Sequence, residues 1–174
     1  MKRNIALFII CLMAILKYLD EQLRSNHPDS WLEVAKCEFA TENHLLGVAK
    51  KCATINRYST NLADKEKQIE IAKALSENSA TTDAVMAELV NSRFPDVWKV
   101  VALSNKSGEK ALLAVAKKCA TINCYSTNLA DKEKQIEIAK ALSENLATTD
   151  AVMAELFNSR FPDVQSIGHK WIEN

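Results

Sequence analysis

The chain has 174 residues, of which 48% are hydrophobic and 6% aromatic, so one domain can bury a sizeable core built mainly from aliphatic side chains. Three glycines and three prolines are few, which argues against disorder, glycine-rich loops and turn-dense β architectures. Twenty-two basic residues balance 22 acidic ones, so no global field attracts nucleic acid or an acidic membrane, and nucleic acid is not an expected partner.

The N-terminal segment, residues 1–26, begins with the basic residues Lys2 and Arg3 and continues with an uninterrupted apolar run over residues 5–16. A basic start followed by an apolar stretch is typical of the first two parts of a secretory signal peptide. The third part is weak, because no small-x-small cleavage site precedes Lys17. A membrane span needs about 20 apolar residues, more than this run provides.

Two interpretations of this segment stay open. A signal peptide or an uncleaved signal-anchor predicts an exported or membrane-tethered protein, with membrane contact through residues 1–16 alone. The alternative is a first helix that continues through residues 21–24 and is buried or docked on a partner, in a cytoplasmic protein. We take the first interpretation as the working prediction.

The rest of the chain, residues 27–174, contains a long internal repeat. Residues 48–97 return as residues 115–164 with 47 of 50 positions identical, at a period of 67 residues. Self-similarity at a fixed period is typical of repeat architectures, in which each unit buries its apolar face against its neighbours. The chain divides into two units and a partial third: residues 27–93, 94–160 and 161–174.

Four helices are predicted in each unit. In the second unit they begin at Pro95, after Gly108, after Asn128 and near Asp150. Aspartate, serine, threonine and asparagine at these starts can cap free N–H groups, and the acidic ones complement the helix dipole. Apolar residues then recur at three- and four-residue spacing. No sustained period-two alternation indicates a strand, so the predicted class is all-α.

Each half of a unit is predicted to form a helix, a short Ser/Asn/Thr turn and a second helix. The chain should then hold four helical hairpins behind the apolar N-terminal helix. Because a lone hairpin cannot cover its own apolar face, we expect an α-solenoid of two near-identical 67-residue units with terminal caps. Gln165 replaces Trp31 and Trp98 in the partial third unit, and a polar residue suits a cap with no further neighbour.

The run Pro-Asp-Val-Trp-x-x-Val-Ala-x-Ser-Asn-x-Ser from Pro95, followed by Ala-Leu-Leu-x-x-Ala from Ala111, resembles leucine-rich-repeat-variant and related HEAT-like helical repeats. Trp31 and Trp98 stand where those families usually place arginine. The cysteine cluster that holds an iron–sulfur centre in some variant-repeat proteins is missing, so no cofactor is implied. The resemblance implies a curved α-solenoid that binds other macromolecules, and it implies no reaction.

The sequence assembles no catalytic or metal-binding motif, so we expect no catalytic residue, metal or cofactor. The histidines, His27, His44 and His169, are scattered, and none recurs at the repeat period, which favours surface or packing roles. Serines and threonines sit at helix starts and turns, where capping explains them. The five cysteines have no CxxC spacing and indicate neither a disulfide framework nor a zinc site. Cys52 and Cys119 lie on apolar stripes and are predicted to be buried.

The best candidates for partner contact are residues that recur in both units. Tyr58 and Tyr125 lie in the stretch between the second and third helices, and Arg93 and Arg160 follow the fourth. A tyrosine ring can present an edge to a partner, and arginine can bind a carboxylate bidentately. The predicted function is non-enzymatic binding of a protein partner through a repeated surface. The alternatives are self-assembly through near-identical repeats and an enzyme with a site between repeats.

Overall fold

The computed structural model describes residues 2–55, 62–121 and 129–172, and every regular element in these residues is helical. The predicted all-α class is therefore confirmed, with no strand in the described residues. The elements follow one another in this order: α1 (Lys2–Arg24), α2 (Pro28–Lys36), α3 (Glu42–Thr54), α4 (Leu62–Glu77), α5 (Asp83–Leu89), α6 (Pro95–Leu103), α7 (Glu109–Thr121), α8 (Leu129–Glu144), α9 (Asp150–Glu155), the 3₁₀-helix η1 (Leu156–Asn158) and α10 (Pro162–Ile172).

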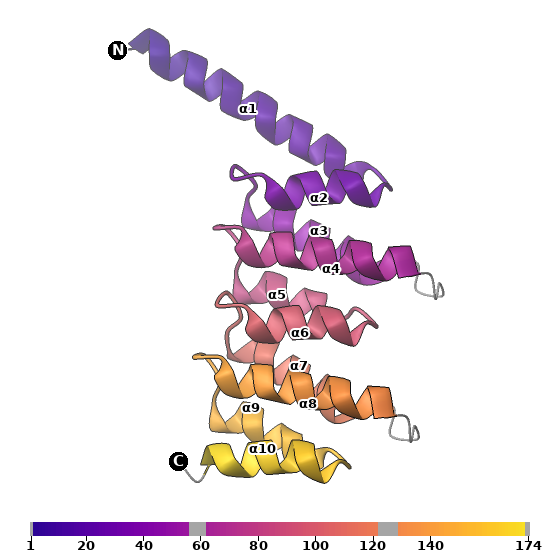
Figure 1. The fold of residues 1–174 in the computed structure, drawn as a ribbon. Coiled ribbons are helices and arrows are strands. Elements are labelled where there is room, and N and C mark those ends of the chain that lie inside the picture. The colour runs from indigo at the N-terminus through magenta and orange to yellow at the C-terminus, as the bar shows by residue number, and fades with distance from the viewer. Residues whose placement is uncertain (1, 56–61, 122–128, 173–174) are drawn as a thin grey trace.

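The helices form two layers that run along an elongated molecule (Figure 1). The even-numbered helices from α2 to α10 pack side by side in one layer, and α3, α5, α7 and α9 pack in the other. The core between the layers is one continuous cluster, built mainly from Val, Leu, Ile and Ala. Cys52 and Cys119 are fully buried in it, as predicted from their place on the apolar stripes.

The helix starts follow from local sequence. Pro28 and Pro95 stand at the first helical positions of α2 and α6, where the missing N–H of proline costs nothing and its fixed φ suits a helix. Asp29 and Asp96 follow in the first turn, where a carboxylate complements the helix dipole. The predicted starts of α6, α7 and α9 are confirmed. The predicted cap at Asn128 lies outside the described residues.

A buried asparagine holds the turn between α4 and α5. The side-chain Nδ2 of Asn78 donates to the carbonyl oxygens of Ala35 at 2.8 Å and Cys37 at 2.9 Å, which end α2. Its Oδ1 accepts from the backbone N–H of Ala80 at 3.0 Å. Asn145 makes the corresponding three bonds 67 residues later, between α8 and α9. One amide therefore shapes its own turn and satisfies the end of the neighbouring helix.

Three equivalent residues in α2, α6 and α10 each donate a hydrogen bond to the segment that precedes the helix. The indole Nε1 of Trp31 donates to the carbonyl of Ser25 at 2.8 Å, and that of Trp98 donates to Ser92 at 2.7 Å. Gln165 occupies the third position, and its Nε2 donates to the carbonyl of Ser159 at 2.6 Å. The glutamine at the last helix therefore keeps the hydrogen bond of the tryptophans without their rings.

The first helix differs from all the others because only part of it joins the layers. Leu19 is buried, and Leu23 packs beside Gly47 of α3. The N-terminal half projects away from the stack (Figure 1) and exposes its apolar side chains. A first helix that continues through residues 21–24, as the second sequence interpretation expects, is present, but residues 5–16 are mostly exposed rather than buried.

Candidate interaction surfaces

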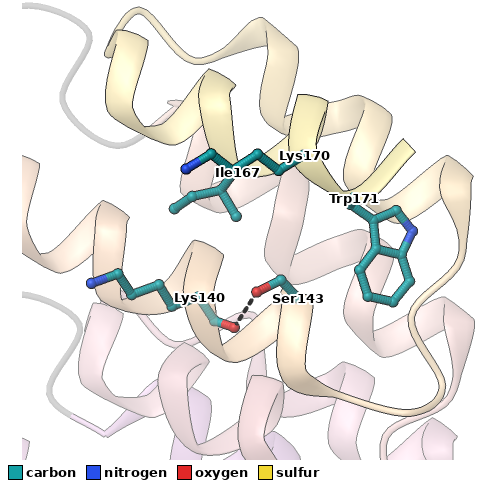
Figure 2. A pocket seen from close by; sticks show the side chains of 5 residues that line it. All are labelled: Lys140, Ser143, Ile167, Lys170 and Trp171. Atoms are coloured by element: carbon teal, nitrogen blue, oxygen red, sulfur yellow. Dashed lines mark hydrogen bonds between the residues drawn. The ribbon is translucent and has the colours of Figure 1, made fainter. Parts of the chain in front are cut away.

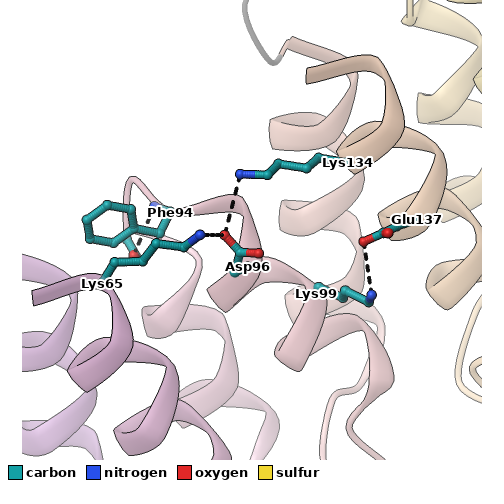
Figure 3. A network of polar contacts seen from close by, with 7 residues as sticks. Lys65, Phe94, Asp96, Lys99, Lys134 and Glu137 are labelled. Atoms are coloured by element: carbon teal, nitrogen blue, oxygen red, sulfur yellow. Dashed lines mark hydrogen bonds and ion pairs between the residues drawn. The ribbon is translucent and has the colours of Figure 1, made fainter. Parts of the chain in front are cut away.

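The layer of even-numbered helices carries a ladder of ion pairs between successive helices. Lys65 Nζ of α4 lies 2.7 Å from Asp96 Oδ2 of α6, and Lys134 Nζ of α8 lies 3.6 Å from the same oxygen (Figure 3). Lys99 Nζ lies 3.0 Å from Glu137 Oε2. Further rungs of the same kind join other helices of this layer: Lys36–Glu70, Lys67–Asp29 and Lys132–Asp163.

Asp96 is the centre of this ladder. Burial raises the pKa of its carboxyl, but the bond to Lys65 and the charges of Lys134 and Lys65 outweigh burial, so the pKa lies below its ordinary value. The carboxylate is ionised at neutral pH and joins α4, α6 and α8. Exposed ion pairs each contribute modestly.

The layer of odd-numbered helices has two adjoining hollows. The first, of about 240 Å³, lies between α3 and α5 and is lined by Lys50, Ala53, Thr54, Glu88 and Asn91. The second, of about 440 Å³, lies between α5 and α7 and is lined by Ala87, Val90, Asn91, Ala114, Lys117, Lys118 and Thr121. Asn91 borders both, so we call them the paired hollows.

The paired hollows combine small apolar side chains with ammonium groups. Ala87, Val90 and Ala114 leave room in the larger hollow because their side chains are short. Lys117 and Lys118 are exposed at its border, and Lys117 Nζ lies 4.0 Å from Glu155 Oε1 of α9. Lys118 Nζ lies 5.7 Å from the centroid of the Trp98 ring, which orients it by a cation–π contact. The surface could therefore bind a partner segment in which a small apolar residue stands next to an acidic one.

A third hollow, of about 310 Å³, lies between α8 and α10 at the end of the stack (Figure 2). Ile167 and Trp171 form its apolar side, and Lys140 and Lys170 supply charge. Ser143 Oγ donates to the Lys140 carbonyl at 2.8 Å, a bond within α8. This hollow belongs to the last pair of helices in the layer and does not continue along the stack.

The structure describes two of the four predicted contact residues. Tyr58 and Tyr125 lie outside the described residues. Arg93 and Arg160 are exposed, each just before the proline that starts the next even-numbered helix. The Arg93 guanidinium carbon lies 4.7 Å from the centroid of the Phe94 ring, and that of Arg160 lies 5.1 Å from the Phe161 ring. The arginines are therefore similarly placed, and neither is among the residues that line the paired hollows.

The predicted packing role of His44 is supported by its contacts. His44 is buried, and its Nδ1 accepts from the Thr41 backbone N–H at 3.1 Å at the start of α3. With Nδ1 as the acceptor, Nε2 carries the proton, and it lies 3.2 Å from Asp20 Oδ1 of α1. His44 therefore caps a helix and joins it to α1. It lines none of the three hollows described above.

Sequence reasoning missed one polar position, Gln68, which is buried in the core. Its Nε2 donates to the Ile55 carbonyl at 3.0 Å, and its Oε1 accepts from Ser92 Oγ at 2.7 Å. Gln135 is equally buried and accepts from Ser159 Oγ at 3.1 Å. The available signal was position, since Gln68 falls on the same helical stripe as the buried residues of α4. These bonds join helices and explain two otherwise costly buried amides.

Within the described residues, no group of three or more His, Cys, Asp and Glu side chains is placed to bind a metal ion. Among the helices that the structure describes, none is both long enough and apolar enough to cross a bilayer. A comparison of the chain with family models, with curated proteins and with solved structures finds no match.

Proposed function

We propose that this protein is a non-enzymatic α-solenoid of the HEAT-like kind that binds a protein partner through the paired hollows. Two features support a solenoid. Helices of one layer pack on their successive neighbours along the length of the molecule. The turn bonds of Asn78 recur at Asn145, so equivalent segments meet their neighbours in the same manner.

The observation that carries the binding proposal is the composition of the paired hollows. Small side chains leave adjoining spaces of about 240 and 440 Å³ on the layer of odd-numbered helices. Lys50 and the carboxylate of Glu88 border the smaller space, and Lys117 and Lys118 border the larger one, so the net charge of the lining is positive. The Asn91 amide donates to Glu88 at 3.2 Å. An extended segment with small apolar and acidic side chains would fill both hollows and pair with the lysines. The partner class is therefore a protein with an acidic, partly apolar segment.

Arg93 and Arg160 extend this proposal to a second site of contact. Each guanidinium stacks on a neighbouring phenylalanine ring, which limits its conformations before a partner arrives. A partner that follows the paired hollows and continues to the connection between α5 and α6 would meet Arg93 with a carboxylate. Tyr58 and Tyr125 stay proposed contacts on the strength of their recurrence in the sequence.

The test is quantitative affinity capture with the full chain and a charge-reversed variant, Lys117→Glu with Lys118→Glu. The matched control, Lys73→Glu with Lys140→Glu, makes the same change in net charge at two equivalent exposed lysines of α4 and α8. A true partner should be captured by the wild type and the control and lost with the first variant, by about tenfold or more. Circular dichroism checks that both variants fold.

Direct binding then settles the chemistry. A peptide taken from the captured protein, with its acidic residues intact, should bind the wild type, and the same peptide with its acids replaced by amides should not. If no protein separates the two charge variants, or if amide peptides bind equally well, the paired hollows are not the binding surface. Measured turnover by the purified chain would contradict the non-enzymatic assignment.

A further inference from the structure

The N-terminal half of α1 exposes large apolar side chains on every side. Six of them are at least 50% exposed: Ile5, Leu7, Phe8, Ile9, Ile10 and Met13. Because an α-helix turns by about 100° per residue, residues 7–10 alone point in all directions around the helix. A protein groove or a second helix covers one side of such a helix. Hydrocarbon covers all sides, so lipid suits this segment better than a protein surface does.

The charges beside this segment have one sign. Lys2 and Arg3 precede the apolar run, the exposed Lys17 follows it, and the first acidic residue of the chain is Asp20. Basic residues at both ends of an apolar helix attract the phosphates of an anionic leaflet. A second copy of the same helix would bring like charges together at the ends when it packs in parallel, and it would still leave apolar sides uncovered.

The apolar length of α1 and the charges at its ends indicate how the helix is oriented relative to the membrane. Twelve residues at 1.5 Å per residue give an apolar length of about 18 Å, well short of the hydrocarbon thickness of about 30 Å. If α1 entered along the membrane normal from its Lys17 end, the two basic residues at its start would lie near the middle of the bilayer, which is costly. In the plane of the leaflet, both basic ends stay among the headgroups.

We infer that α1 binds an anionic lipid surface and lies in the plane of one leaflet, with residues 5–16 beneath the headgroups. Its second half packs on α2 and α3 through Leu19 and Leu23, so the stack of helices is held directly at that surface. This inference uses a different part of the molecule from the paired hollows and does not depend on them.

The test is flotation of the full chain with vesicles of phosphatidylcholine, either alone or mixed with phosphatidylglycerol in equal parts. Binding to the anionic vesicles should be about tenfold tighter. The double substitution Phe8→Gln with Ile10→Gln keeps the charge and should weaken binding by at least about tenfold. The matched control is Leu146→Ser, which removes a fully exposed leucine elsewhere and installs the residue found at the equivalent position 79. It should bind like the wild type.

A thiol-labelling experiment checks the orientation. The substitution Asn4→Cys places a thiol at the start of the apolar run, and Cys11 is an exposed thiol in its middle. On vesicles, a membrane-impermeant maleimide added outside should label position 4 and spare Cys11, as peptide mass mapping would show. Three outcomes would overturn the inference. The first is that the chain does not bind vesicles. The second is that position 4 is protected from the maleimide, as it would be in a helix that spans the bilayer. The third is that the chain forms a dimer instead of binding vesicles and that the Phe8/Ile10 variant abolishes this dimer.

Discussion

Residues 1–25 and residues 68–92 occupy equivalent positions at the 67-residue period, yet they fold differently. Residues 68–92 form most of α4, a turn, α5 and the connection that follows it, whereas residues 2–24 form one unbroken helix, α1. The second half of α1 packs on α2 and α3 as α5 packs on α6 and α7. Its first half, in the position of α4, projects from the stack (Figure 1).

The turn residues explain the difference. Asn78 ends α4 through its side-chain bonds. Thr82 stands at the N-cap position of α5, where its side chain makes no cap bond, and α5 begins at Asp83. At the equivalent positions in α1 stand Cys11 and, four and five residues later, isoleucine and leucine. These residues offer no side-chain bond to a turn, so the helix continues. A few polar residues therefore decide whether an apolar segment folds back into the stack or stays outside it.

The missing turn also changes the neighbouring helix. Asp83 Oδ1 accepts from the N–H groups of Gly108 at 2.7 Å and Ala111 at 3.1 Å, and so caps α7 from outside. Since leucine replaces this aspartate in α1, α3 needs a cap of its own, which Thr41 and His44 provide. The lone buried histidine of α3 is therefore a local replacement for a contact that the repeat supplies elsewhere.

The largest effect is expected from removing the asparagine that distinguishes the two regions. Asn78→Leu would leave the buried Ala35 carbonyl and the Ala80 N–H without their side-chain partner. The Cys37 carbonyl would keep its bond from the Ala40 N–H and lose the one from Asn78. The change should therefore lower the free energy of unfolding by about 3 kcal/mol, as urea denaturation would measure. Ser79→Leu is the control, because leucine already stands at the equivalent position 146. Equal stability of the two variants would refute the role of the turn.

The equivalent residues Trp31, Trp98 and Gln165 allow the ring and the hydrogen bond to be separated. Trp98→Gln should keep a bond to the Ser92 carbonyl, as Gln165 keeps its own, but lose the buried ring, at a cost of about 3 kcal/mol. Trp98→Phe keeps most of the ring and loses the donor, at a cost of about 1 kcal/mol. Chemical denaturation compares them, and the reverse order would show that the bond matters more than packing.

Each unit contains one equivalent buried thiol, and the free energy of unfolding should therefore decrease at alkaline pH. Burial raises the pKa of Cys52 and of Cys119 to about 12. In the unfolded chain these thiols ionise near pH 9, whereas in the folded chain they stay protonated up to about pH 12. The free energy of unfolding therefore keeps its full contribution from the thiols below pH 9 and falls as the pH rises from 9 to 12. Each thiol should contribute about 1 kcal/mol per pH unit in that range. Denaturation at pH 8 and 10 should show a smaller loss for Cys52→Ala and Cys119→Ala than for the wild type.

The smallest effect tests how α1 fits its neighbour. A Cβ on Gly47 would lie 2.7 Å from Leu23 Cδ2, whereas in the next unit Ala114 lies near the shorter Val90. Gly47→Ala should therefore change stability little, because the shift it forces on the Leu23 side chain offsets the better helix propensity of alanine, about 1 kcal/mol. Adding Leu23→Val should release part of that gain. A double-mutant cycle by thermal denaturation measures the coupling. Additive effects would mean that the two sites do not share this space.

Helix positions and the buried thiols could be predicted, because capping residues and apolar spacing act within a few residues of each other. The starts at Pro95 and Asp150 and the burial of Cys119 are examples. The paired hollows could not be predicted, because their lining residues come from helices about 30 residues apart and each is an ordinary residue in its own helix. The buried bond between Gln68 and Ser92 was missed for the same reason.

By itself the sequence determined where helices form and that a 67-residue segment occurs twice, because helix propensity, capping and apolar periodicity are local properties of the chain. Tertiary packing decided which of those apolar surfaces are covered. Leu19 and Phe8 belong to one helix and are both apolar, yet one is buried against the stack and the other is in solvent. Burial depends on which neighbours lie within contact distance, and only the folded arrangement of the helices determines that.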